Sequence, residues 1–118
     1  MMKTKRGDVV RVLFPNSDLR TTKRRPALVI QSDQLKTGLS QTVVVMITSN
    51  LVNAQNPSRV LVMKSSPEGQ QSGLRLDSVV MTDNLATILE TEIDSVLGAL
   101  PQQTMAKVSD ALRHTLEL

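Results

Sequence analysis

Short apolar runs separated by turn-forming residues fill the first hundred positions of the chain. The runs at 9–14, 27–30, 41–48, 60–63, 78–85 and 95–100 have the length of β-strands and are rich in β-branched side chains. Positions 43–47 are apolar without a break, so both faces of that strand should be buried. The run at 78–85 is expected to continue to residue 88 with a bend. The pattern predicts five to seven short strands.

The end of the chain has a helical period instead. Pro101 suits the first turn of a helix. One apolar stripe follows at spacings of three, four and four: Met105, Val108, Leu112 and Leu116. Arg113 and His114 fall near the C-terminus of this helix, where cations are favoured, so His114 is expected to be a helix-end residue rather than a catalyst.

The segments between the strands are short. Residues 15–18 form a predicted turn, 19–24 a basic loop, 32–35 a short helical turn, 65–73 a flexible loop and 90–94 an acidic turn. This spacing leaves no room for βαβ crossovers, so the sheet should be mainly antiparallel. We expect residues 1–118 to form a single domain of the mainly β (β-rich α+β) class: a small closed or half-closed barrel of antiparallel strands packed against a C-terminal helix.

Composition removes several classes of function. A chain of 118 residues with 40% hydrophobic content can bury a core without disulfides or a structural metal. The absence of cysteine excludes disulfides, thiolate catalysis and cysteine-based zinc sites, and one histidine cannot build a histidine cluster. We therefore expect no metal and no other cofactor. No apolar run approaches the ~18 residues of a membrane span, and the basic N-terminus lacks the apolar stretch of a signal peptide. We expect a cytoplasmic protein without a membrane partner.

Charge and aromatic content narrow the choice of partner. Residues 1–30 carry eight basic and two acidic side chains, a local balance of +6, whereas residues 31–118 have a balance of −3. Such asymmetry indicates a polyanion or an acidic protein as partner, with nucleic acid first. Phe14 is the only aromatic residue. RNA binding would therefore depend on phosphate contacts, base edges and arginine planes rather than on aromatic stacking platforms.

The basic stretch Lys23-Arg24-Arg25 runs directly into Pro26 and an apolar strand. Proline disfavours the α region for the residue before it, so Arg25 should be extended and its guanidinium direction fixed. A cation held in a fixed direction at the start of a strand is suited to bind a phosphate or a carboxylate. The alternative is a solvated basic loop that precedes a strand, since charge runs usually are solvated faces.

The remaining candidate groups suit one reaction. The chain has no nucleophile elbow, no P-loop and no dinucleotide fingerprint. RNA carries its own nucleophile, the 2′-hydroxyl, and cleavage then needs alignment and charge stabilisation on the phosphate. Arg25 and Thr48, each at the end of a buried strand, are candidates if those ends meet. Arginine stays protonated, so Arg25 is assigned to charge stabilisation and the general base is left open.

Three stretches in this order resemble the MazF/PemK (Kid) family of toxins: Arg6-Gly7-Asp8-Val9-Val10, Arg25-Pro26-Ala27-Leu28-Val29-Ile30 and Val44-Val45-Met46-Ile47-Thr48-Ser49. The later strand 78–88 and the segment 97–100 with its helix are also similar to the family. The resemblance implies an SH3-like (CcdB/MazF-like) barrel that forms a homodimer. It further implies a metal-independent, sequence-specific endoribonuclease that leaves 2′,3′-cyclic phosphate and 5′-hydroxyl ends on single-stranded mRNA. A cognate antitoxin with an acidic, partly disordered tail would block the site.

By this resemblance the catalytic residues fall on Arg25 and Thr48. Substrate binding is predicted for the basic loop, the end of the central strand and an acidic position of the later strand: Asp18, Arg20, Lys23, Arg24, Ser49, Asn50 and Asp83. The chain departs from the family in three respects. Its first loop follows Phe-Pro-x-x-Asp-Leu rather than Gly-x-Glu-Gln-x-Gly. Met81 occupies the position of the Kid arginine two residues before Asp83, and the Kid histidine has no counterpart.

Two other hypotheses use the same barrel, because a fold does not fix a function. A CcdB-like poison of DNA gyrase would cause DNA breaks without RNA cleavage. An inactive nucleic-acid or antitoxin-binding module would bind RNA with a steep salt dependence and leave it intact.

Overall fold

The computed structural model describes residues 3–15, 18 and 20–118. Asn16, Ser17 and Leu19, which belong to the predicted turn and basic loop, lie outside these residues. The body of the protein is a six-stranded sheet. Its strands are β1 (Asp8–Pro15), β2 (Thr22–Val29), β3 (Gln41–Thr48), β4 (Arg59–Val62), β5 (Ser78–Leu89) and β6 (Ile93–Ala99). The helices are α1 (Pro67–Ser72), the 3₁₀ turn η1 (Glu90–Glu92) and α2 (Gln102–Leu116).

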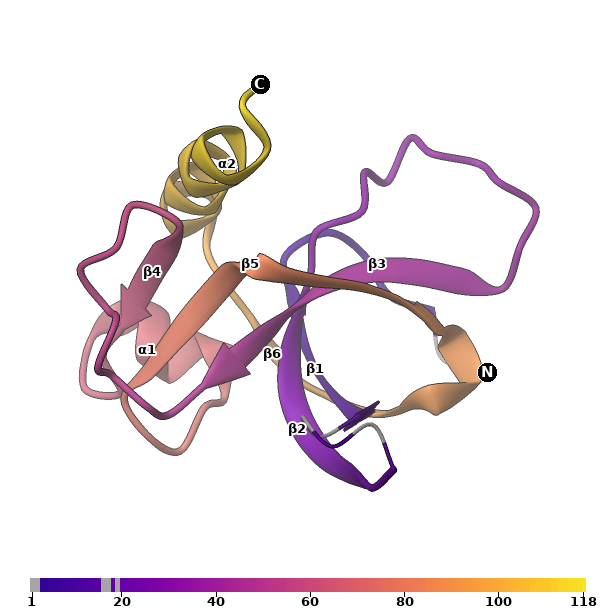
Figure 1. Ribbon diagram of the computed structural model, residues 1–118, viewed down its shortest axis with the longest axis horizontal. Helices are drawn as coiled ribbons and strands as arrows, with labels where there is room; N and C mark the ends of the chain where they lie inside the picture. The colour runs from indigo at the N-terminus through magenta and orange to yellow at the C-terminus, as the bar shows by residue number, and fades with distance from the viewer. Residues whose placement is uncertain (1–2, 16–17, 19) are drawn as a thin grey trace.

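The strands follow the order β4-β5-β3-β2-β1-β6, and every neighbouring pair is antiparallel. The predicted antiparallel sheet and the C-terminal helix are therefore confirmed. The sheet curls strongly, and α2 lies beside β4 and β5 (Figure 1). β5 continues past residue 85 as predicted, but its bend lies within the run 78–85 rather than after it. Val45 of β3 pairs with Leu85, but the next residue, Met46, pairs with Met81, so residues 82–84 bulge out of the ladder.

Apolar side chains pack on both faces of the sheet. Val9, Leu28, Val45 and Val80 join a cluster that includes Val108 of α2. The alternate positions of the same strands form a second cluster inside the curl: Val10, Val12, Phe14, Ala27, Val29, Val44, Ile88 and Ile93. The expectation that the central strand is buried on both faces is confirmed, since Val44 and Val45 are both fully buried.

Helix α1 closes the gap between the two edges of the sheet. It follows β4 directly and contacts β6, the strand at the opposite edge. Gly98 of β6 lies so close to α1 that an added Cβ would meet the Gln71 carbonyl oxygen at 2.4 Å. The sheet edges are thereby covered without a direct ladder between them.

The prediction of a flexible loop at 65–73 was wrong. The Ser66 side chain caps α1 by accepting a hydrogen bond from the Gly69 N–H at 3.0 Å. Pro67 stands at the first helical position, and Gly73 ends the helix in the left-handed region with a φ of 74°. These are the usual start and stop signals of a helix, and we attributed the same residues to a loop.

Three further boundaries differ from the predictions. β2 begins at Thr22, so Lys23, Arg24 and Arg25 lie on a strand rather than on a loop, because each pairs with a residue of β1. The acidic turn is a 3₁₀ turn that ends at Glu92, and β6 already starts at Ile93. Residues 32–35 form a single turn, closed by the Leu35 N–H on the Ser32 carbonyl at 3.1 Å, and no helix.

Helix α2 buries Thr104, Met105, Val108 and Ala111. The predicted stripe is therefore right in its first half, whereas Leu116 at its end is 48% exposed. Within the segments that the structure describes, neither α1 nor α2 combines the length and the apolar character needed to cross a membrane.

Candidate functional site

The ends of β2 and β3 bring the two predicted catalytic residues together. Ala27 pairs with Met46 in this antiparallel ladder. The ladder ends there, and Arg25 and Thr48 each lie two residues beyond it on their strands, where both side chains line one cavity. Both side chains are half-buried. The condition set by the sequence, that the two strand ends meet, is thus fulfilled, while the catalytic roles stay predictions.

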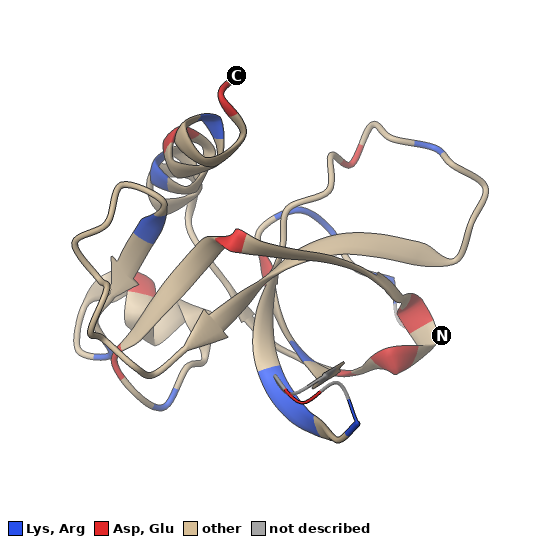
Figure 2. Cartoon of the chain, viewed as in Figure 1, with Lys and Arg blue, Asp and Glu red and all other residues tan. Residues whose placement is uncertain are grey.

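A cavity of about 380 Å³ opens at this point. Its polar lining comes from β1, β2, the end of β3 and the residue after it, the segment after α1, and the start of β5: Arg11, Lys23, Arg24, Arg25, Thr48, Ser49, Arg75 and Ser78. Among the described residues that line it, five are Lys or Arg and none is acidic. A concave site with charges of one sign concentrates the opposite charge, so this cavity attracts a polyanion. Figure 2 shows the basic start of β2 that supplies three of these cations.

Local hydrogen bonds orient the hydroxyl of Thr48. The backbone N–H of Asn50 donates to Thr48 Oγ1 at 3.1 Å. Because the hydroxyl oxygen accepts this bond, its proton is left to donate toward the cavity. The side-chain oxygen of Asn50 in turn accepts from the Val52 N–H at 3.1 Å and closes the following turn. The polar stretch after β3 therefore builds a turn that presents Thr48.

One wall of the cavity is the segment between α1 and β5. The Ser72 hydroxyl accepts from the Leu74 N–H at 3.1 Å, and the Ser78 hydroxyl donates to the Leu76 carbonyl at 2.8 Å. These two bonds fix the segment on either side of Arg75. Together with Pro26, Ile47 and Leu97, the apolar side chains Leu74 and Leu76 form the non-polar part of the lining.

Sequence reasoning missed two cations of this cavity. Arg11 is the one charged residue inside its strand, and it pairs with Pro26 of the Arg-Pro motif. That isolated charge was a usable signal, although only the strand pairing assigns it to the site. Arg75 belongs to the segment after α1 and carries no signal in the sequence, because its position depends on how the helix packs between the sheet edges.

Four predicted substrate-binding residues do not line the cavity: Asp18, Arg20, Asn50 and Asp83. Asp18 accepts from the Arg20 and Thr21 N–H groups at 2.9 and 3.0 Å and from the Thr21 hydroxyl. These bonds, led by the one from the Thr21 N–H, hold the pKa of Asp18 below its ordinary value. Asp18 therefore organises the loop that leads into β2. Lys23, Arg24 and Ser49, in contrast, line the cavity beside Arg25 and Thr48.

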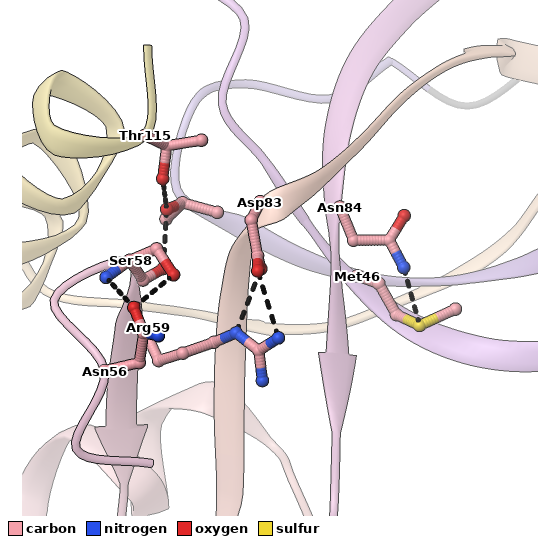
Figure 3. Close-up of polar contacts among 8 residues, drawn as sticks. Met46, Asn56, Ser58, Arg59, Asp83, Asn84 and Thr115 are labelled. Carbon is pink, nitrogen blue, oxygen red and sulfur yellow. Dashed lines mark hydrogen bonds and ion pairs between the residues drawn. The ribbon is translucent and has the colours of Figure 1, made fainter. Parts of the chain in front are cut away.

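Asp83 lies in the bulge of β5 and is held by an arginine from the next strand. Its two carboxylate oxygens accept from Arg59 Nε at 2.9 Å and Nη2 at 3.1 Å (Figure 3). Arg59 pairs in register with Met81. A guanidinium thus stands beside Asp83 although Met81 supplies none. The bulge is tied on its other face by Thr82, whose hydroxyl donates to the Ser58 carbonyl at 2.6 Å and lies 2.8 Å from that of Thr115.

Comparisons with known proteins agree on one family. A family model described as PemK-like, MazF-like toxin of type II toxin–antitoxin system matches residues 5–116. The Mycobacterium tuberculosis (strain ATCC 25618 / H37Rv) protein named Endoribonuclease MazF6 is 35% identical over 107 residues, which are 90% of either chain. The Bacillus subtilis (strain 168) protein named Endoribonuclease EndoA is 30% identical over 118 residues, covering 99% of this chain and 97% of its own.

The fold agrees as well. A solved endoribonuclease from a mycobacterial species, in complex with its cognate antitoxin, has a TM-score of 0.74 with this chain. The match covers 98% of this chain and 97% of that one at 24% identity. Three findings agree: the family model over residues 5–116, the relatives of nearly equal length, and the barrel with the Arg-Pro motif in its basic cavity. The chain therefore belongs to the PemK-like, MazF-like toxins of type II toxin–antitoxin systems.

Proposed function

We propose that the cavity at the ends of β2 and β3 is the catalytic centre of an endoribonuclease that cleaves single-stranded mRNA at specific sequences. The observation that carries the proposal is that Arg25 and Thr48, at the ends of adjacent strands, line one cavity with four further cations. Membership of the toxin family and the names of the two relatives, both endoribonucleases, support it.

In the reaction, the 2′-hydroxyl oxygen of one nucleotide attacks the adjacent phosphorus. The 2′-hydroxyl gives up its proton to water as the bond from the 2′-oxygen to phosphorus forms. The bond from phosphorus to the 5′-oxygen breaks, and this oxygen takes a proton from water, which leaves a 2′,3′-cyclic phosphate and a 5′-hydroxyl. The guanidinium of Arg25 stabilises the negative charge that grows on the phosphate oxygens. The Thr48 hydroxyl donates to a phosphate oxygen and aligns the group for attack. This chemistry uses the nucleophile of the substrate and needs no metal or cofactor.

The bases must be held without aromatic stacking. Phe14 is 5% exposed and belongs to the inner apolar cluster, so it offers no platform. The apolar wall of Leu74, Leu76 and Leu97 and the planes of the arginines take its place in the cavity. The chain's contacts to RNA are therefore mostly phosphate contacts, which makes binding strongly dependent on salt.

The partner of such a toxin is an antitoxin. The described lining of the cavity is basic and lacks carboxylates. An acidic, partly disordered antitoxin tail would occupy it by charge complementarity and so block access of RNA. We further infer that the toxin acts as a homodimer in the cytoplasm, where its RNA substrate lies. A monomer in gel filtration at micromolar concentration would contradict the dimer.

The activity is tested by incubating the purified protein with a long single-stranded RNA in EDTA and mapping the new ends. We expect 5′-hydroxyl ends at a recurring short sequence, lost in Arg25→Ala and strongly reduced in Thr48→Val. Arg113→Ala is the matched control, because Arg113 is an exposed arginine of α2 paired with Asp110 and does not line the cavity. Intact RNA would refute the proposal. DNA breaks with captured gyrase would then favour the CcdB-like alternative.

A further inference from the structure

A charged cluster on three strands borders the catalytic pair. Asp94 of β6 forms ion pairs with Arg11 Nε of β1 at 3.5 Å and with Arg24 Nη1 of β2 at 3.4 Å. The ladder between β1 and β6 slips at this point, since Arg11 pairs with Ser95 and Val12 with Ile93. Asp94 is the extra residue of this bulge. Bulges re-aim a side chain, and here the bulge directs one carboxylate at two guanidinium groups.

These ion pairs orient the arginines more than they stabilise the fold. The side chains of Arg11 and Arg24 are 49% and 48% exposed, and pairs in such surroundings contribute little free energy. Each guanidinium has five donors, so both retain donors for an additional anion. Both arginines line the cavity. The cluster is thus a pair of prearranged cations beside the proposed reaction centre.

The strand alternation separates this cluster from the catalytic arginine. Arg24 and Arg25 are successive residues of β2, and successive side chains of a strand point to opposite faces. Arg11 pairs with Pro26, which lies on the same face as Arg24. Arg24 and Arg11 therefore approach the cavity from the face of β2 opposite to that of Arg25. This placement favours contact with a second phosphate.

Arg75 adds a third cation from the segment after α1. The bond from the Leu74 N–H to the Ser72 hydroxyl and the bond from the Ser78 hydroxyl to the Leu76 carbonyl fix the backbone on either side of Arg75. The Arg75 side chain contributes to the cavity lining. A single strand of RNA that places its scissile phosphate at Arg25 presents its neighbouring phosphates a nucleotide away on either side. The three cations Arg11, Arg24 and Arg75 in the same cavity offer a binding place for one of these neighbouring phosphates.

We propose that Arg11, Arg24 and Arg75 bind a phosphate of the RNA adjacent to the one being cleaved, and that Asp94 is a positioning residue that directs Arg11 and Arg24. The inference rests on the proposed function for the identity of the ligand. It adds the residues that set the register of the RNA strand relative to the reacting pair.

The first test locates the phosphate. Short RNAs centred on the mapped cleavage sequence carry a 2′-deoxy nucleotide at the cut, which prevents cleavage, and one neutral methylphosphonate at each flanking position in turn. We expect one flanking position to weaken binding to the wild type about tenfold, as for the loss of one charge-assisted contact. The same substitution should cost Arg24→Ala and Arg75→Ala less than about twofold. Equal losses in the wild type and both variants would overturn the proposal.

The second test concerns Asp94 and has opposite outcomes for two explanations. Asp94→Asn removes one negative charge beside a basic cavity, so long-range attraction alone would tighten RNA binding. A positioning role predicts the reverse: weaker binding, and loss of the discrimination between the methylphosphonate positions. Tighter binding with the discrimination intact would overturn the role of Asp94.

The third measurement separates the failure of this proposal from the failure of the proposed function. The salt dependence of binding to a generic single-stranded RNA requires no cleavage. Its slope should fall by about 0.7, the value for one phosphate, when Arg11, Arg24 and Arg75 are replaced together by alanine, and stay unchanged for Arg113→Ala. If the RNA stays intact while the slope falls, the proposed endoribonuclease activity is refuted and the phosphate subsite is supported. If the RNA is cleaved while the slope does not change, the subsite is refuted and the endoribonuclease activity is supported.

Discussion

The contact between Gly73 and β6 holds the wall of the cavity in place, and its replacement by alanine tests this. Gly73 has a φ of 74°, and a Cβ added there would meet the Leu97 carbonyl oxygen at 2.1 Å and its carbon at 2.7 Å. Both are backbone atoms of β6, so no side chain can move aside. Gly38 is the matched control: its φ is 76°, and nothing lies within 4 Å of the same Cβ.

Both substitutions place alanine at a positive φ, and only Gly73→Ala also causes a steric clash. Placing alanine in the left-handed region costs about 1 kcal/mol, and that is the whole effect expected for Gly38→Ala. For Gly73→Ala, α1 and β6 must also move apart, which adds about 2 kcal/mol on the scale of overpacked cores. The expected loss is therefore about 3 kcal/mol, less than the stability of an ordinary domain, so the variant should still fold.

Urea unfolding followed by far-UV circular dichroism measures the difference, since the chain has no Trp or Tyr to report by fluorescence. The midpoint of Gly73→Ala should fall by about 1 M more than that of Gly38→Ala. Gly73→Ala should also raise the KM for RNA, because Leu74, Arg75 and Leu76 follow the displaced residue. Equal destabilisation of the two variants would refute the packing argument.

Three other outcomes follow from the contacts described. Thr82→Val removes the hydroxyl that joins β5 to the Ser58 carbonyl and to α2, so the free energy of unfolding measured in urea should fall by about 1 kcal/mol. The control Thr87→Val, at an exposed position of β5, should lower it by less than about 0.5 kcal/mol. Asp83→Asn leaves the largely buried Arg59 guanidinium without its anion, so the free energy of unfolding should fall by about 1 kcal/mol. Adding Arg59→Met to this variant should lower it little further. Independent, additive losses would argue against a coupled pair. The pKa of Asp18 in an NMR titration should lie below 3.8, so the loop keeps its stabilisation above pH 3.8 and loses it as the pH falls through the lowered pKa; a value at or above 3.8 would contradict the role of its hydrogen bonds.

The sequence by itself determined the strands and the C-terminal helix, and it predicted the pair Arg25 and Thr48. Runs of β-branched residues and the 3.6-residue stripe are local patterns, and the position of Pro26 restrains Arg25 without reference to the rest of the chain. The helix α1 was also within reach, because Ser66, Pro67 and Gly73 carry its boundaries. We attached the same residues to a loop.

Only the tertiary structure decided which cations share the cavity. Arg11 and Arg24 reach it through the pairing of β1 with β2 and through Asp94, whose direction depends on a slip in the ladder to β6. Arg75 reaches it because α1 packs between the sheet edges. These placements come from contacts between segments far apart in the chain. No local pattern of residues encodes a register or a bulge, because both are set by the partner strand.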